Sequence, residues 1–308
     1  MRLVIRATLL VLLATPVVAQ MRLATSVDIP AEQVAISGQT AYVASGSTLT
    51  VFDISNVPEL VELGHVEMPD QIYGMSVESD RAYLAVGLEG LHIVQLADGT
   101  TPQLIGMYPT PGQAVDVSII GTHAIISNLM TGLEIVDISN TRQPTLIATA
   151  ETPGYQRSVS SSGPFAYVVD QPSGVHVFDI RRPSAPNAIA SLPAEEEPPR
   201  SVTVRSNRAY VVYQQTGVVE VVDISDPTSP NTLGSYQANG HPQTVDIMDT
   251  SLVVPVGPNG VEIVALDDPE TPQVTATYDT PGNAVDVATS GNHLFIADSN
   301  GLVVVELP

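Results

Sequence analysis

The sequence predicts an all-β protein built from seven similar units, because one short phrase recurs along almost the whole chain. In its third copy the phrase is Leu-Glu-Ile-Val-Asp-Ile-Ser, residues 133–139. Neighbouring copies are 41 to 44 residues apart, and the fifth position of the phrase falls at Asp53, Gln95, Asp137, Asp179, Asp223, Ala265 and Glu306. A repeat of about 40–45 residues that contains strands is typical of a β-propeller blade. We therefore expect a seven-bladed β-propeller with four-stranded antiparallel blades.

Four strand signals fill each repeat, and the third repeat shows them most clearly. Short apolar runs lie at residues 114–118, 123–127, 133–139 and 146–149, with turn residues such as Gly121-Thr122 between them. Short apolar, β-branched runs between Gly, Pro, Asn and Ser predict strands joined by turns. The recurring phrase is thus the third strand of its blade. A Gly precedes most copies of it, which indicates a tight turn with positive φ.

The two ends of the repeat region predict how the ring closes. The last repeat ends after its third strand, at Leu307-Pro308, and lacks a fourth. Residues 23–30 resemble the fourth-strand segment of the third repeat, residues 146–153. We expect this N-terminal strand to complete the last blade, which removes an open edge from the ring. The prediction is one domain over residues 20–308.

The first 19 residues are expected to lie outside this domain. Arg2 and Arg6 precede an apolar run at residues 7–18, and small residues follow it up to Ala19. Positive charge, an apolar stretch too short to span a bilayer and small residues at its end are typical of a secretory signal peptide. We predict a signal peptide over residues 1–19, with a buried N-terminal helix or a membrane anchor as the alternative. The mature protein would then be exported, and periplasmic, secreted or associated with the cell surface.

The composition is acidic, and this restricts the partners. The chain has 33 Asp and Glu, 11 Arg and no Lys, which gives a net charge of −22, and it has no Cys. A strong negative field disfavours nucleic acid and anionic membranes. Without Cys, no disulfide contributes to stability. We expect a monomer with a protein or small-molecule ligand, without nucleic-acid binding or membrane insertion.

The third and fifth copies of the phrase resemble the LVIVD repeat. They read Leu-Glu-Ile-Val-Asp at residues 133–137 and Val-Glu-Val-Val-Asp at residues 219–223. The resemblance covers nearly the whole mature chain, although Gln95 and Ala265 replace the expected Asp in the second and sixth copies. It implies a propeller protein of the exported or cell-surface kind found in bacteria and archaea. The family has no agreed catalytic motif, so the resemblance assigns no functional residue.

Ligand-binding residues are expected in the loops that lead into the innermost strands, because seven such loops converge on one mouth of the central channel. Pro-Gly pairs recur there as turn formers, so the residues that do not repeat are the informative ones. These candidates are Tyr73, Tyr155, Arg157, Arg200 and His241. Arg157 and Arg200 lead into adjacent blades, and two guanidiniums near the axis could hold a carboxylate or phosphate. The alternative is that both arginines pair with Glu195 to Glu197.

Aspartates at equivalent places on the innermost strands form a second group of candidates. Asp246 and Asp286 fall in neighbouring blades, whereas Asp116 is expected well away from them. Two carboxylates beside a channel could bind a cation or act as an acid–base pair. The alternative is structural, with each carboxylate satisfying backbone groups of the channel wall.

No motif indicates a metal, a cofactor or a known catalytic class. The six His are dispersed and the chain has no Cys, so no zinc or copper site is expected. The sequence contains neither a phosphate-binding Gly-rich loop nor a nucleophile elbow. We therefore expect an exported, non-catalytic scaffold that works without a cofactor. The alternative function is a propeller hydrolase or lyase that uses Asp246, Asp286, His241 and the two arginines.

Overall fold

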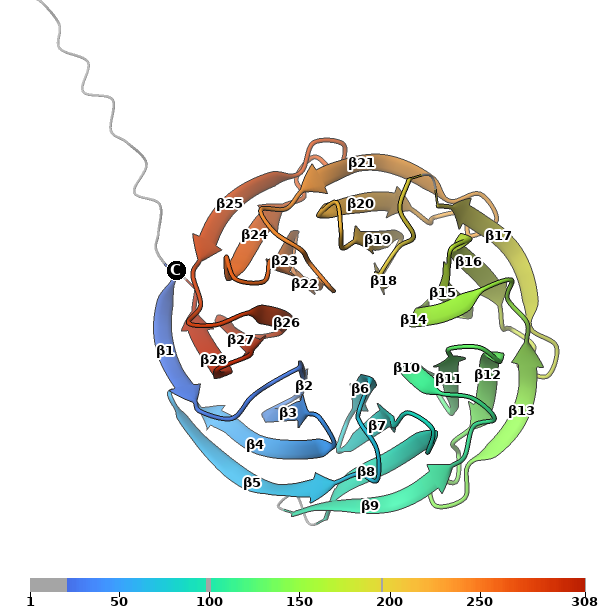
Figure 1. The fold of residues 1–308 in the computed structure, drawn as a ribbon, viewed down its shortest axis with the longest axis horizontal. Coiled ribbons are helices and arrows are strands. Elements are labelled where there is room, and N and C mark those ends of the chain that lie inside the picture. The colour runs from blue at the N-terminus through green and yellow to red at the C-terminus, as the bar shows by residue number, and fades with distance from the viewer. Residues whose placement is uncertain (1–20, 98–100, 195, 308) are drawn as a thin grey trace, which may run out of the picture.

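The computed structural model describes residues 21–97, 101–194 and 196–307. These residues form 28 β-strands in seven four-stranded antiparallel sheets around a central axis (Figure 1). The predicted seven-bladed β-propeller is thus confirmed. The predicted signal peptide at residues 1–19 lies outside the described residues. In the part of the chain that the structure describes, no helix is long and apolar enough to cross a membrane.

Each blade begins at the axis and ends at the rim, so its strands occupy four concentric positions. The innermost strands are β2 (Gln33–Ser37), β6 (Gly74–Glu78), β10 (Ala114–Ile120), β14 (Tyr155–Ser162), β18 (Ser201–Arg205), β22 (Asp246–Met248) and β26 (Ala284–Ser290). The second strands are β3 (Thr40–Ser45), β7 (Arg81–Ala85), β11 (His123–Asn128), β15 (Phe165–Gln171), β19 (Arg208–Tyr213), β23 (Ser251–Pro255) and β27 (His293–Asp298).

The recurring phrase forms the third strand of every blade, as predicted. These strands are β4 (Thr48–Asn56), β8 (Leu91–Ala97), β12 (Gly132–Asp137), β16 (Gly174–Asp179), β20 (Val218–Asp223), β24 (Val261–Ala265) and β28 (Gly301–Glu306). The outermost strands are β5 (Glu59–Glu67), β9 (Thr101–Tyr108), β13 (Thr145–Ala150), β17 (Asn187–Pro193), β21 (Asn231–Gln237), β25 (Gln273–Tyr278) and β1 (Arg22–Val27).

The N-terminal strand completes the last blade, which confirms the predicted closure. β1 pairs antiparallel with β28, from Arg22 opposite Glu306 to Val27 opposite Leu302. The last sheet therefore has the order β1-β28-β27-β26, and blue β1 lies beside red β28 in Figure 1. Because this blade combines both ends of the repeat region, β-ladder hydrogen bonds hold the two ends together.

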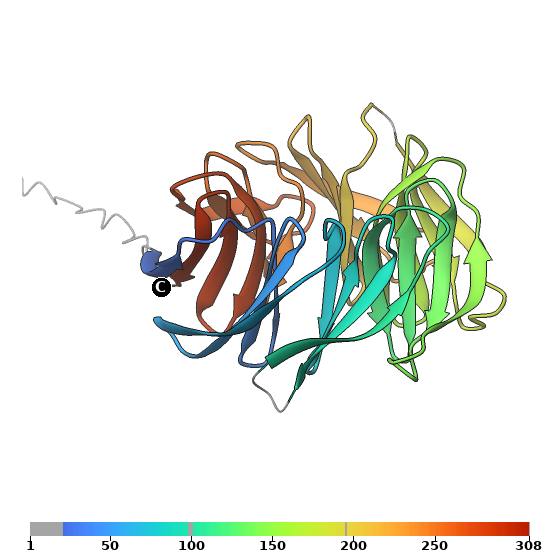
Figure 2. The ribbon, with the colours of Figure 1, turned by 60° about the horizontal axis from the view of Figure 1, so that its bottom comes forward.

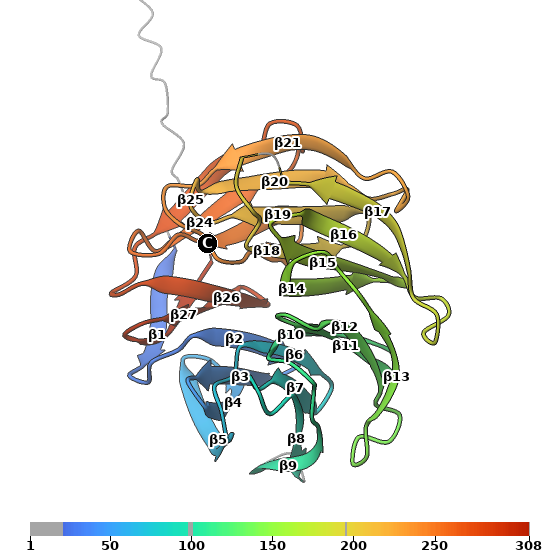
Figure 3. The same ribbon diagram turned by 45° about the vertical axis from the view of Figure 1, so that its right-hand side comes forward.

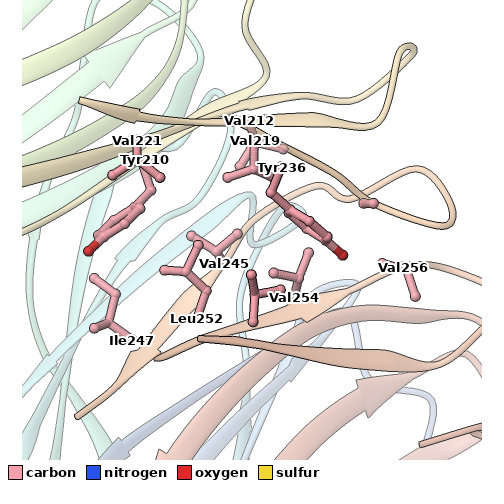
Figure 4. Packing of buried hydrophobic residues seen from close by; sticks show 12 residues of the cluster. Tyr210, Val212, Val219, Val221, Tyr236, Val245, Ile247, Leu252, Val254 and Val256 are labelled. Carbon is pink, nitrogen blue, oxygen red and sulfur yellow. The ribbon is translucent and has the colours of Figure 1, made fainter. Parts of the chain in front are cut away.

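The hydrophobic core lies between neighbouring blades. In the cluster of Figure 4, Tyr210 and Tyr236 of the fifth blade share a buried core with Leu252 and Val254 of the sixth. The middle strands are apolar on both faces because each blade lies between two others, as Figures 2 and 3 show from the side. This packing makes a rigid ring whose innermost strands face the channel.

Candidate functional site at the channel mouth

The innermost aspartates join neighbouring blades. Asp286 accepts a hydrogen bond at Oδ1 from the Val287 N–H and one at Oδ2 from the Val34 N–H of the first blade, both 2.9 Å long. Asp116 accepts hydrogen bonds in the same way from the N–H groups of Val117 and Val159. Asp246 accepts them from the N–H groups of Ile247 and Thr289. Each carboxylate thus satisfies an N–H at the edge of the next blade, which would otherwise lie unpaired at the channel wall.

Other blades make comparable connections with hydroxyl groups. The Ser160 Oγ accepts a hydrogen bond of 3.0 Å from the Val204 N–H. The Thr203 Oγ1 donates to the Val245 carbonyl at 3.1 Å. Short polar side chains on the innermost strands therefore replace the missing strand-to-strand ladder between blades. Their recurrence favours the structural role over a catalytic one.

Burial makes these aspartates weaker acids than an ordinary aspartate. It raises the pKa of Asp286 to about 7, although the N–H groups of Val34 and Val287 oppose the shift. It also raises the pKa of Asp116 to about 6 and shifts the pKa of Asp246 upward. The charges of Asp246 and Asp116 raise the pKa of Asp286 further. The pKa of Asp286 thus responds to the charge of Asp116, which also lines the channel.

A cavity of about 560 Å³ opens at the mouth of the channel. Its volume falls in the usual range for small-molecule sites, about 300–1,000 Å³. The walls carry four glutamine side chains and the two arginines, together with Asp116 and Asp286 near the axis; the glutamines are Gln33, Gln71, Gln113 and Gln243. The cavity is therefore polar and rich in hydrogen-bond donors and acceptors.

Arg157 and Arg200 both line the cavity, and neither forms an ion pair with a described carboxylate. Arg157 Nε donates to Gln171 Oε1 at 3.3 Å, and Arg200 Nη2 donates to Gln243 Oε1 at 3.4 Å. Burial lowers the pKa of Arg200, and the charge of Arg157 lowers it further. The two guanidiniums therefore repel each other and hydrogen-bond to neutral glutamines, while the charge of Asp116 partly opposes the shift at Arg200.

The expected pairing of these arginines with the nearby glutamates is wrong for Glu197. This residue is buried, and its carboxylate accepts hydrogen bonds from the N–H groups of Gln215 and Thr216, at 2.6 and 2.9 Å. It therefore stabilises the turn between β19 and β20. Glu196 is exposed and forms no ion pair with another described residue, and Glu195 lies outside the described residues. The positive charge in the cavity thus remains unneutralised by Glu196 and Glu197.

The structure brings together four of the seven candidate residues. Tyr73, Arg157, Arg200 and Asp286 line the cavity, whereas Tyr155, His241 and Asp246 do not. His241 Nδ1 lies 3.0 Å from the Gln214 carbonyl, on the neighbouring turn. Sequence reasoning missed the glutamines, yet a signal was present. Gln113 and Gln243 both stand three residues before an innermost aspartate.

A metal centre has no support from side-chain geometry. Within residues 21–97, 101–194 and 196–307, no group of three or more His, Asp or Glu side chains is placed to hold a metal ion. The two cavity aspartates already accept backbone hydrogen bonds at both oxygens. The arrangement is better suited to holding an anion on the arginine side.

The closed ring of seven four-stranded sheets makes the protein a seven-bladed β-propeller, and its sequence repeats identify the family within that fold. The chain belongs to the LVIVD-repeat family, which matches residues 30–67, 111–152, 153–192, 199–238 and 281–307, more than half of its length. The unmatched blades contain Gln95 and Ala265, the two departures from the repeat. No curated protein matches the sequence.

Solved structures share the fold at low sequence identity. The β-propeller domain of Cps50 (Swd1) from Myceliophteria thermophila is 9% identical with a TM-score of 0.76, over 94% of this chain and 100% of that one. The computationally designed Ika8 protein is 10% identical with a TM-score of 0.69, over 93% and 99%. At such identities the likeness concerns the fold alone.

Proposed function

We propose that this protein is an exported, non-catalytic binding protein whose channel mouth holds a ligand with a carboxylate or phosphate group. The observation that carries the proposal is the pair Arg157 and Arg200, which share the cavity and form no ion pair with any carboxylate that the structure describes. Burial and the charge of Arg157 both lower the pKa of Arg200, so an anion bound between the two guanidiniums would offset their repulsion. Guanidinium groups bind carboxylates and phosphates through paired hydrogen bonds.

Export is supported by the signal-peptide pattern of residues 1–19. The non-catalytic assignment is supported by the way in which the aspartates are used. Both oxygens of Asp246 and of Asp286 accept backbone N–H groups, which gives both carboxylates a structural role in joining neighbouring blades. His241 lies outside the cavity lining. The alternative hydrolase or lyase therefore has less support.

Titration calorimetry on the mature chain tests the anion site. We expect succinate, citrate or phosphate to bind at constant ionic strength, whereas neutral succinamide does not. Arg157→Gln and Arg200→Gln should each weaken anion binding about 10- to 100-fold, because a hydrogen bond to a charged group contributes about 1.5–3 kcal/mol. Both variants should remain folded, since each removes a repelling charge.

The matched control is Arg142→Gln, which changes an exposed arginine outside the cavity. This variant should bind anions as the parent does. Equal weakening in all three variants would show that binding follows the overall charge and not the cavity. Absence of binding for every anion would refute the proposed function.

A further inference from the structure

Four large apolar side chains stand exposed around one side of the cavity mouth. Tyr73, Leu88, Met130 and Tyr155 are 39%, 73%, 72% and 52% exposed. The other exposed large apolar side chains among the described residues lie on the outermost strands β1, β5, β9, β13 and β25. These four instead belong to blades two, three and four, in or beside the loops at the mouth. We name them the apolar arc.

Contacts between loops fix the first half of the arc. A side-chain carbon placed on Gly87 would lie 3.2 Å from the Tyr73 ring, so this ring lies against the β7–β8 turn that carries Leu88. The Leu88 N–H donates to Asp70 Oδ2 at 3.1 Å, which holds the tip of the turn. Tyr73 also lines the cavity. This half of the arc is therefore continuous with the cavity wall.

The second half joins the first through backbone hydrogen bonds. The Ala114 N–H donates to the Gly87 carbonyl at 2.8 Å, which connects the turn to the third blade. The Leu129 N–H donates to the Gln113 carbonyl at 2.9 Å, and the Leu129 carbonyl accepts from the Gln156 N–H at 3.1 Å. Met130 directly follows Leu129, and Tyr155 directly precedes Gln156. The two apolar residues therefore lie on neighbouring backbone segments. The four residues of the arc thus lie on hydrogen-bonded segments of three consecutive blades.

The turn geometry does not require a long side chain such as Leu at the tip. The sixth blade has a turn of the same form, in which Val256 N–H donates to the Gly260 carbonyl at 2.8 Å, as Val86 does to Gly90. Pro258 occupies the position of Leu88 in that turn. Exposing Leu88 to water gains nothing for the fold, which favours a role in contact with a partner.

The charged residues around the arc restrict where a ligand can carry negative charge. Glu89 and Glu151 are exposed near its edge and the exposed Glu32 lines the cavity, so added negative charges on a ligand would be repelled. The positive charge lies in the cavity wall, at Arg157 and Arg200. A fitting ligand therefore has one negative group at its end and an apolar body behind it.

We infer that this site binds the C-terminal end of an extended polypeptide, with its carboxylate on the two arginines and its apolar side chains on the arc. This inference rests on the proposed function. The side-chain amides of Gln113 and Gln243 line the cavity, where they match the peptide groups next to the carboxylate. An open arc suits a chain with a polar backbone, whereas an acyl chain would require an enclosed apolar pocket.

Fluorescence anisotropy on the mature chain tests the inference. The probe is a pool of fluorescein-labelled pentapeptides with mixed Leu, Tyr and Phe at their last three positions, made with free carboxylates and with C-terminal amides. The free carboxylates should bind at least tenfold more tightly than the amides. Leu88→Ser combined with Met130→Ser should weaken peptide binding at least fivefold and leave succinate binding unchanged.

Leu146→Ser is the matched control, because Leu146 is 47% exposed on β13, away from the mouth. It should leave peptide binding unchanged. Equal binding of the amidated and free peptides would overturn the inference, as would tighter binding of decanoate than of the peptides. If succinate binds and the peptides bind no better, the anion site stands and the peptide inference fails. If neither binds, the proposed function itself fails.

Discussion

Two sets of repeated aspartates carry opposite pKa shifts. Asp137, after the third strand, accepts the Ser139 N–H at 2.8 Å in an open turn, and this hydrogen bond lowers its pKa. Asp286 also accepts N–H groups, yet its burial at the channel wall raises its pKa to about 7. Desolvation therefore outweighs hydrogen bonding at the wall, whereas hydrogen bonding prevails in the turn.

Stability should depend on pH through the buried aspartates. The pKa values of Asp286 and Asp116 are about 7 and about 6 in the folded chain, above the ordinary value of 3.8. Between these values the folded state binds more protons than the unfolded state, so stability falls as pH rises. We expect urea unfolding to give a larger free energy at pH 5 than at pH 8. Asp286 alone should account for about 2–3 kcal/mol of this difference.

The variant Asp286→Asn should flatten this dependence, although its overall stability falls because an amide cannot accept both N–H groups. Asp137→Asn is the control. Its lowered pKa places its titration below this range, so the difference between pH 5 and pH 8 should persist. Identical pH profiles for Asp286→Asn and the parent would contradict the assignment.

At the scale of elements, glycine at the start of a third strand meets two structural requirements, positive φ and close approach of another backbone segment. The sequence predicted positive φ at the turn, and Gly90 and Gly132 have φ of 81° and 93°. In addition, a side-chain carbon on Gly132 would lie 2.6 Å from the Ala150 carbonyl oxygen at the end of the outermost strand. Gly121, with φ of 57°, has nothing within 4 Å. Close approach of backbone therefore adds to the requirement at Gly132.

Alanine substitution should separate the two requirements. Gly132→Ala should cost about 2–4 kcal/mol of unfolding free energy, because overpacking adds to the left-handed backbone strain. Gly121→Ala should cost only about 1–2 kcal/mol, from backbone strain alone. Thermal and urea unfolding of both variants provide the measurement. Equal costs would mean that the Ala150 segment moves aside without penalty.

The elements were predictable from sequence to a greater extent than the site. Seven copies of one pattern average out local irregularity, so the third strands and the closing strand could be located. Side-chain direction at the mouth could not, because the register of β14 against β15 shifts between Gln156 and Ser158. This irregularity breaks the alternation that would otherwise place Tyr155 and Arg157 on one face. Repeat spacing also gives no channel width, so the influence of Asp116 on Asp286 was missed.

At the scale of the whole molecule, stability depends on the junction between the first and last blades. Phe295 and Val304 of the last blade share a buried cluster with Val34 and Phe52 of the first. The bond from Val34 N–H to Asp286 crosses the same junction. The β1–β28 ladder completes it. Loss of β1 would expose β28 and open the ring.

Deletion of residues 20–30 should therefore abolish cooperative unfolding. The matched control is a circular permutant in which residues 20–30 follow residue 308 through a short Gly-Ser linker. Since Arg22 lies opposite Glu306, this linker spans one hairpin. The permutant should unfold cooperatively near the temperature of the parent. A deletion variant with unchanged melting, followed by circular dichroism, would contradict the role of β1.

The shared last blade also determines where the molecule can be attached to something else. β1 is the outermost strand of that blade, β28 is its neighbour, and the C-terminus lies beside β1 at the rim in Figures 1 and 2. A dye, a fused domain or an immobilising tag at either end of the described fold would sit at the periphery of the disc. Both openings of the channel would stay accessible to solution, so the protein can be mounted on a sensor surface by either terminus without covering the cavity.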